Sequence, residues 1–289
     1  MNVAIVGLGL IGGSLGRAIV KRREDRVFAF DISHKAMIDG KLLSAYHEQL
    51  NKEDLSKMDV VIFSLYPKAL ESALSEYCPL LKKGALVMDC CGNKRRVVAQ
   101  MKELSKKFPD LDFISAHPMA GREFSGVSHS TASLFEKASM ILVPVKAGLK
   151  RLAEIKEFSL SLGFSSVVVT TAEKHDEIIA FTSQLAHLVS SSYIKSPTAN
   201  QFMGFSAGSF RDMTRVARLS SEMWSQLTVE NKDFLVAEID NIINSLNQYK
   251  CALQAGDVNK MKELLEDGNQ KKLASEKMRR SKNNQNDKE

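Results

Sequence analysis

The chain has 289 residues, of which 44% are hydrophobic and 26% charged, with a formal net charge of +6. This composition is that of a globular protein with one large or two moderate domains, and it excludes a largely disordered chain. The four cysteines contain no C-x-x-C pair, and no basic residue precedes the apolar start. These features argue against a disulfide scaffold and an export signal. We therefore expect a cytoplasmic protein that binds no metal and crosses no membrane.

The first twenty residues, MNVAIVGLGLIGGSLGRAIV, contain a short β-branched run, a cluster of glycines and an apolar stretch with helical spacing. Gly7, Gly9 and Gly12 have the G-x-G-x-x-G spacing. The first glycine permits a tight turn, the second lets a pyrophosphate approach the backbone, and the third lets helix and strand pack closely. Leu10 and Ile11 open the helix, whose free N–H groups would bind that phosphate. The pattern predicts a dinucleotide-binding turn.

A second strand, VFAFD, ends in Asp31, 19 residues beyond Gly12. An acidic side chain at this distance would hydrogen-bond a ribose hydroxyl of the dinucleotide. A carboxylate there would also repel the 2′-phosphate of NADP, so NAD is the expected cofactor. Lys35 lies close by in the sequence and leaves NADP open as an alternative. The simpler interpretation is that Asp31 only ends a strand.

Short apolar runs then alternate with segments of helical spacing. The candidate strands are residues 59–66, 84–91, 111–117, 138–145 and 165–170, and the candidate helices are residues 68–81 and 95–107. Such alternation predicts βαβ units and a doubly wound sheet. Ligands of these sheets bind outside the carboxyl ends of the strands. Candidate groups at those ends are Ser64, the DCCGNK turn at 89–94 and His117 in AHPMAG.

From Ala172 the strand pattern stops, and two long periodic segments predict an all-helical second part. We expect an α/β fold, with a Rossmann-type dinucleotide-binding domain over residues 1–170 and a helical dimerisation domain over residues 171–267. Residues 268–289 hold seven basic and three acidic side chains, which is +4 of the net charge. We predict a disordered basic tail there, and we do not expect nucleic acid as a partner.

Four motifs resemble, in this order, those of prephenate dehydrogenases and their relatives that act on arogenate: GLGLIGGS, SAHPMAGREFSGV, EKHDEIIAFTSQLAH and SFRDMTRVARLSSEMW. The resemblance runs from Met1 to about Leu253. It implies the NAD-dependent oxidative decarboxylation of prephenate to 4-hydroxyphenylpyruvate, in tyrosine biosynthesis. It also implies a homodimer formed through the helical domain. Aromatisation drives the loss of carbon dioxide, so the reaction needs no metal.

The resemblance also implies roles for individual residues. His117 matches the general base that accepts the proton of the ring hydroxyl. Arg215 matches the arginine that binds a substrate carboxylate, for which its guanidinium fork is suited. The other expected substrate-binding residues are His187, Asp212, Glu123, Gly92 and Asn93. The expected cofactor-binding residues are Gly7, Gly9, Leu10, Ile11, Gly12, Asp31 and Ser64.

Some positions depart from the family pattern. Gly92 stands where many members have a serine that supports the catalytic histidine, Gln184 replaces a histidine, and Ala186 replaces a proline. His175 and Asp176, in EKHD, match a family pair, which we interpret as helix-start structure. Because of these departures, the resemblance does not specify which side chain hydrogen-bonds the catalytic histidine.

Three alternative functions remain open. An arogenate dehydrogenase would form tyrosine directly, and a pocket carboxylate such as Asp212 or Glu123 would favour its ammonium-bearing substrate. A β-hydroxyacid dehydrogenase would use a lysine of the helical domain as its acid and base, and Lys174 and Lys195 are available. A protein that senses NAD or binds nucleic acid would use the basic tail, but it would not explain the histidine and arginine motifs.

Overall fold

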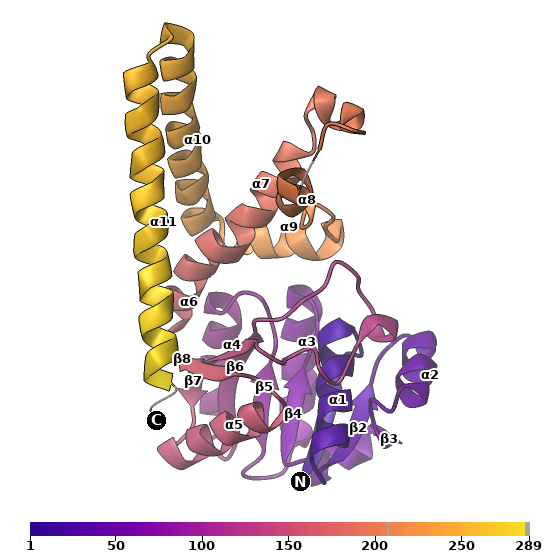
Figure 1. Cartoon of the computed structure of the whole chain (residues 1–289). Coiled ribbons are helices and arrows are strands. Elements are labelled where there is room, and N and C mark those ends of the chain that lie inside the picture. The colour runs from indigo at the N-terminus through magenta and orange to yellow at the C-terminus, as the bar shows by residue number, and fades with distance from the viewer. Residues whose placement is uncertain (207, 287–289) are drawn as a thin grey trace. The chain divides into compact units, whose positions relative to one another are not determined.

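The computed structural model describes residues 1–206 and 208–286. Its centre is an eight-stranded sheet in the order β3-β2-β1-β4-β5-β6-β7-β8 (Figure 1). Neighbouring strands are parallel except for β6 and β7, which are antiparallel. The strands are β1 (Asn2–Val6), β2 (Arg26–Phe30), β3 (Glu48–Gln49), β4 (Val60–Phe63), β5 (Leu86–Asp89), β6 (Asp112–Pro118), β7 (Ser139–Lys146) and β8 (Ser166–Val169).

Each predicted strand is present, and two features of the sheet were not predicted. The edge strand β3 has only two residues, both exposed, so no apolar run marks it. The reversed direction of β7 was also missed. Between β6 and β7 the chain forms only a short 3₁₀ turn (Val127–His129), without a crossover α-helix. Antiparallel neighbours need no such helix, whereas parallel neighbours do.

Helices cover both faces of the sheet, which makes it the predicted doubly wound fold. Val3 and Ile5 pack into one apolar cluster with α1, α2 and α5, and Ala4 and Val6 pack into a second with α3 and α4. Burial on both faces explains why the strands are continuous apolar runs. The helices are α1 (Leu10–Arg22), α2 (His34–Leu42), α3 (Pro67–Tyr77), α4 (Arg95–Lys107) and α5 (Leu149–Ser161).

The helical part begins directly after β8. Its first helix consists of α6 (Ala172–Ile179), a π-helical segment (Ala180–Leu185) and α7 (Ala186–Tyr193). The next helices are α8 (Gly208–Thr214), α9 (Ser221–Glu230) and α10 (Lys232–Ala255). Asn231 separates α9 from α10. Its buried Nδ2 donates to Asp176 O (2.9 Å) and to Gln184 Oε1 (2.8 Å).

Backbone contacts divide the chain into one compact unit that ends at Leu235 and another that begins at Val236. The predicted boundary near Thr170 lies inside the first unit, where β8 gives way to α6. The second unit holds most of α10 and α11 (Val258–Asn286). The chain reverses between these helices at Gly256, whose φ of 65° favours glycine, and Asp257 N donates to Ala252 O (3.0 Å).

Residues 268–286, expected as a disordered tail, belong to α11 in the structure. This segment has many straight-chain residues of high helix propensity, and Lys271–Asp267 and Lys272–Glu276 are ion pairs at helical spacing. The last three residues of the predicted tail, 287–289, lie outside the described residues. Within the described chain, no helix is long and apolar enough to cross a bilayer.

Candidate active site

The glycine turn joins β1 to α1 at the carboxyl edge of the sheet. Gly7 has a φ of 99°, and a Cβ there would lie 2.4 Å from Ser64 O. A Cβ on Gly12 would lie 1.9 Å from Gly7 O. Packing therefore excludes side chains at both positions, while a Cβ on Gly9 would meet nothing within 4 Å. The space beside Gly9 and the free N–H groups at the start of α1 fit a dinucleotide pyrophosphate.

Asp31 lies beside this turn, directly after β2. Its carboxylate accepts hydrogen bonds from Leu8 N (2.7 Å) and Ser33 N (2.8 Å). The structure thus brings Asp31 to the glycine turn, as the sequence predicted. A carboxylate has further acceptor capacity, so a ribose hydroxyl could still donate to it. Lys35, the residue that left NADP open, pairs with Asp39 at 2.6 Å.

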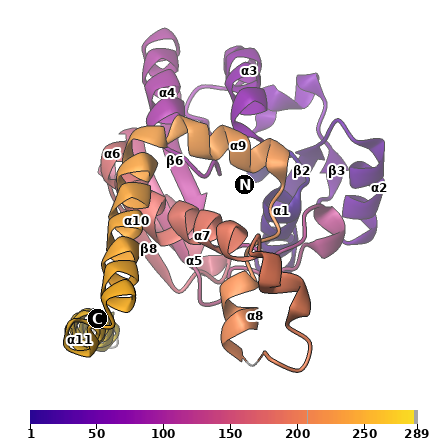
Figure 2. The ribbon, with the colours of Figure 1, turned by 90° about the horizontal axis from the view of Figure 1, so that it is seen from above.

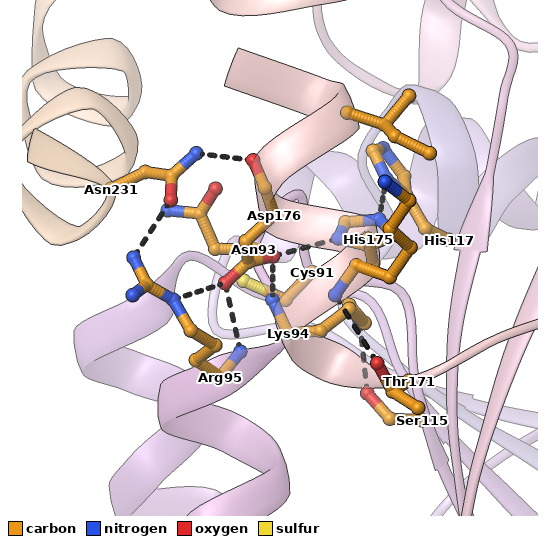
Figure 3. A network of polar contacts seen from close by, with 12 residues as sticks. Cys91, Asn93, Lys94, Arg95, Ser115, His117, Thr171, His175, Asp176 and Asn231 are labelled. Atoms are coloured by element: carbon orange, nitrogen blue, oxygen red, sulfur yellow. Dashed lines mark hydrogen bonds and ion pairs between the residues drawn. The ribbon is translucent and has the colours of Figure 1, made fainter. Parts of the chain in front are cut away.

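His117 lies at the end of β6, half-buried, and contacts a second histidine. Its Nδ1 is 2.9 Å from Nε2 of His175 on α6, and Nδ1 of His175 is 2.7 Å from Oδ1 of Asp176 (Figure 3). Burial, and then electrostatic interactions with His175 and Lys94, hold the pKa of His117 well below its usual 6.5. His117 is therefore neutral near pH 7 and can accept a proton.

The interpretation of His175 and Asp176 as helix-start structure holds for Asp176 at the start of α4, and not at the start of their own helix α6. The first turn of α6 is capped by Thr171, whose side chain accepts from Lys174 N. Asp176 instead accepts from Lys94 N (2.7 Å) and Arg95 N (3.0 Å), at the start of α4. Burial alone would raise the pKa of Asp176, but hydrogen bonds from His175 and these N–H groups lower it. The signal available in the sequence was the EKHD motif itself.

A buried lysine next to the histidine was missed at the sequence level. Lys94 and Asp89 are fully buried and pair at 2.6 Å. Lys94 Nζ also donates to Ser115 Oγ (3.0 Å) and to Ala116 O (2.7 Å), directly before His117. This network holds the end of β6 in place. The opposite charges at the two ends of the DCCGNK turn were the signal that could have identified it.

The rest of this turn packs against the helical part. Asn93 is buried, donates to Leu227 O (2.7 Å) and accepts from Gln184 Nε2 (2.8 Å). Its carboxamide is thus already hydrogen-bonded within the protein, and its contact with substrate stays a prediction. A Cβ on Gly92 would lie 3.3 Å from both methyl groups of Leu227. A serine at position 92 would therefore need Leu227 to move.

The other expected substrate residues lie on the helical part and on the segment after β6. Arg215 Nη1 donates to Glu123 Oε1 at 3.0 Å, and the two side chains are 63% and 36% exposed. His187 stacks at a tilt on Trp224, with 4.3 Å between ring centroids, and its Nδ1 is 2.8 Å from Ser183 O. Asp212 is exposed on α8.

The carboxyl ends of β1, β4, β5 and β6 meet at one edge of the sheet, because these four strands are parallel neighbours. The glycine turn, Ser64, the DCCGNK turn and His117 therefore share that edge, where doubly wound sheets bind their ligands. Helices α6 and α9 meet the same edge through His175 and Leu227, and α9 crosses over it when seen from above (Figure 2). This fold and site define a dinucleotide-dependent dehydrogenase.

Comparison with known proteins identifies the family. Residues 15–168 match the model of the prephenate dehydrogenase nucleotide-binding domain, and residues 171–267 match that of the prephenate dehydrogenase dimerization domain. The chain belongs to the prephenate dehydrogenase family.

Individual relatives agree with this assignment. The chain is 28% identical to a cyclohexadienyl dehydrogenase of Zymomonas mobilis, over 94% of this chain and 95% of that one. It is 27% identical to a prephenate dehydrogenase of Bacillus subtilis, over 89% and 71%. The fold matches a crystal structure of prephenate dehydrogenase from A. aeolicus in complex with hydroxyphenyl propionate and NAD+, with a TM-score of 0.81, 24% identity and coverage of 95% and 98%.

Proposed function

We propose that this chain catalyses the NAD-dependent oxidative decarboxylation of prephenate to 4-hydroxyphenylpyruvate, in tyrosine biosynthesis. The observation that carries the proposal is the position of His117, a neutral histidine at the same sheet edge as the glycine turn. The family membership of both parts of the chain supports it.

The cofactor set consists of the residues around the glycine turn. The N–H groups of Leu10 and Ile11 and the open face of Gly9 would hold the pyrophosphate. Asp31 would accept a ribose hydroxyl, and its charge disfavours a 2′-phosphate. Lys35, the residue that left NADP open, is exposed and pairs with Asp39. Bound NAD supplies the hydride acceptor.

His117 acts on the ring hydroxyl. It accepts the hydroxyl proton as the ring carbon loses hydride, which leaves a ketone. The ring carboxylate then departs as carbon dioxide, and its electron pair makes the ring aromatic and the ketone oxygen a phenolate. The proton on His117 returns to this oxygen, so the phenol forms without net proton uptake. General acid–base catalysis of this kind contributes about 10²–10⁴-fold in rate.

Arg215 binds a substrate carboxylate in this proposal. Its pairing with Glu123, on the segment that follows His117 and β6, would hold the guanidinium in place before substrate arrives. The backbone N–H of Glu123 and the Arg215 side chain lower the pKa of Glu123, so it remains a carboxylate. An incoming substrate carboxylate would replace that partner, and the guanidinium fork could then bind both of its oxygens. His187, tilted on Trp224, and Asp212 complete the proposed substrate set.

Arogenate is the second candidate substrate. It carries an ammonium group where prephenate has a ketone, and Glu123 is a carboxylate next to Arg215. One relative also carries the broader name cyclohexadienyl dehydrogenase. The lysines that a β-hydroxyacid dehydrogenase mechanism would use fit less well. Lys174 is exposed and pairs with Glu177, and Lys195 is also exposed.

The dimerization-domain match supports a homodimer formed through the helical part. We keep residues 1–170 and 171–267 as the functional division of the chain. We also keep a cytoplasmic location, because all four cysteines are free thiols.

The experiment is NADH formation by the purified protein with NAD and prephenate, and separately with NAD and arogenate. It is repeated with His117→Asn and with the control His47→Asn. His47 Nδ1 accepts from Val27 N on the β2–β3 side of the sheet, and asparagine can replace that acceptor. We expect turnover with prephenate, a loss of about 10²-fold or more in His117→Asn, and near-normal rates in His47→Asn.

NAD binding to both variants is measured alongside. Normal NAD affinity in an inactive His117→Asn protein would support the role of the base. Undiminished turnover in that variant would remove His117 from its role. Turnover with arogenate alone would change the substrate, and NAD binding without turnover of either substrate would overturn the proposed reaction.

A further inference from the structure

Three side chains form a continuous hydrogen-bonded chain behind the proposed base. His117 Nδ1 lies 2.9 Å from His175 Nε2, and His175 Nδ1 lies 2.7 Å from Asp176 Oδ1 (Figure 3). The side chain of His175 is 0% exposed and that of Asp176 is 2% exposed. Solvent therefore does not compete for these contacts.

The protonation states of these three side chains follow from Asp176, which lies at the opposite end of the network from His117. Asp176 is surrounded by donors, because Lys94 N, Arg95 N and Arg95 Nε (3.2 Å) all point to its oxygens. An ionised carboxylate only accepts hydrogen bonds, so His175 must carry a proton on Nδ1. Burial lowers the pKa of His175 in spite of this carboxylate, and its ring is therefore neutral near pH 7.

A neutral His175 with its proton on Nδ1 has a lone pair on Nε2. That nitrogen must accept from its neighbour, so the proton of neutral His117 resides on Nδ1. The lone pair of His117 then lies on Nε2, the ring nitrogen not engaged by His175. A protonated His175 would reverse the bond and leave Nε2 of His117 protonated, which is the wrong form for a base.

We infer that His175 and Asp176 are positioning residues, which hold His117 in the tautomer whose Nε2 accepts the substrate hydroxyl proton. This inference rests on the proposed function. When Nε2 takes the proton, the His117 imidazolium still donates from Nδ1 to His175. Asp176 stabilises the resulting charge through His175, as carboxylates do behind catalytic histidines in hydrolases.

The hydrogen bonds of Asp176 to the start of α4 and to Asn231 hold the three side chains in place. Its oxygens are bound by the N–H groups that begin α4, and its own carbonyl accepts from Asn231 Nδ2 at 2.9 Å. The neighbouring Lys94 Nζ holds Ala116 O directly before His117. Both ends of the three-residue chain are thus attached to buried structure.

The first test compares His175→Leu with His175→Gln. Leucine fills similar space but has no acceptor, whereas the glutamine amide oxygen can take the place of Nε2. We expect kcat to fall by about 10²-fold or more in His175→Leu, with KM for prephenate and NAD changed by less than about threefold. We expect His175→Gln to recover most of that loss. An unchanged kcat in His175→Leu, or equal losses in both variants, would overturn the inference.

The second test needs no folded variant of His175. Nitrogen-15 NMR of histidine-labelled wild-type protein distinguishes the two tautomers, and the His117 signals are assigned by their absence in His117→Asn. We expect Nδ1 of His117 to be protonated and Nε2 to be unprotonated above its pKa. The opposite tautomer would overturn the inference.

The outcomes separate this inference from the proposed function. If His117→Asn abolishes turnover and His175→Leu does not lower kcat, the proposed base stands and only the positioning role fails. If His117→Asn is fully active, both fail.

Discussion

His117 is a half-buried base close to the positive charge of Lys94, and both conditions favour its neutral form. Burial lowers its pKa first, followed by electrostatic interactions with His175 and Lys94. The acid limb of the kcat/KM profile with prephenate should therefore have its inflection below pH 6.5, the usual value for histidine. Initial rates between about pH 8 and about pH 5 measure it. An inflection at or above 6.5 would contradict this prediction.

The same histidines should make folding depend on pH. In the unfolded chain they protonate near the usual 6.5, while in the folded protein the pKa values of both His117 and His175 are lower. Between these values the unfolded chain binds more protons, so the free energy of unfolding should fall as pH drops below 6.5. Urea titrations above and below this value check the sign. Replacing His175 with glutamine should reduce the slope.

Lys94 and Asp89 form the most buried ion pair of the described residues, with 0% exposure on each side. Lys94→Met would leave the Asp89 carboxylate buried without its charge partner. We expect the free energy of unfolding to fall by about 3–5 kcal/mol. The matched control is Lys106→Met, since Lys106 pairs with Glu103 and both side chains are more than half exposed. That exposed pair should be worth less than about 1 kcal/mol, and equal effects in urea denaturation would count against the argument.

At the scale of elements, two glycines of the turn between β1 and α1 should have different roles. Gly12 should matter for the stability of the fold, and Gly9 for the binding of NAD. Gly12→Ala would push a Cβ to within 1.9 Å of Gly7 O, whereas Gly9→Ala would meet nothing within 4 Å. We expect Gly12→Ala to lower the melting temperature. Gly9→Ala should keep it and lose at least about tenfold in NAD affinity, because its methyl group occupies the space of the pyrophosphate. Scanning calorimetry measures the melting temperature, and titration calorimetry measures the affinity for NAD. Full NAD affinity in Gly9→Ala would contradict the proposed position of the pyrophosphate beside Gly9.

Helix α6 carries His175 and Asp176, and its start depends on one side chain. Thr171 Oγ1 accepts from Lys174 N at 3.2 Å. Thr171→Ala should cost about 1 kcal/mol of stability, and Thr171→Ser should cost little because the hydroxyl is kept. Chemical denaturation of the two variants gives the comparison. Equal losses would show that the methyl group of Thr171 matters more than its cap.

At the scale of the whole molecule, the second unit has apolar side chains that are exposed to solvent in a single chain. They include Leu246 at 61% and Leu253 at 70% on α10, and Leu265 at 54% on α11. Apolar exposure of this kind is typical of association surfaces. The double substitution Leu246→Glu and Leu253→Glu should convert the expected dimer to monomer in sedimentation equilibrium. An unchanged dissociation constant of the dimer would show that the interface lies elsewhere.

Much of this protein could be predicted from local patterns. The strands of the sheet followed from apolar runs, and the cofactor turn followed from the spacing of Gly7, Gly9 and Gly12 and the distance to Asp31. These features depend on residues close in sequence. Strand β3 could not be predicted for the same reason, because two exposed residues at a sheet edge have no apolar pattern. The helix over residues 268–286 could not be predicted either, because exposed helices and disordered tails are both rich in polar and charged residues.

The sequence by itself determined the order of the elements, the dinucleotide turn and the family motifs, because backbone sterics and apolar periodicity act over a few residues. Only the tertiary structure decided which polar groups meet. It joined His117 to His175 across 58 residues, buried Lys94 against Asp89, and hydrogen-bonded the carboxamide of Asn93 to Gln184. Such contacts depend on where separate strands and helices end in space. Burial then decides their protonation, since a buried group must take its hydrogen bonds and its charge partners from the protein.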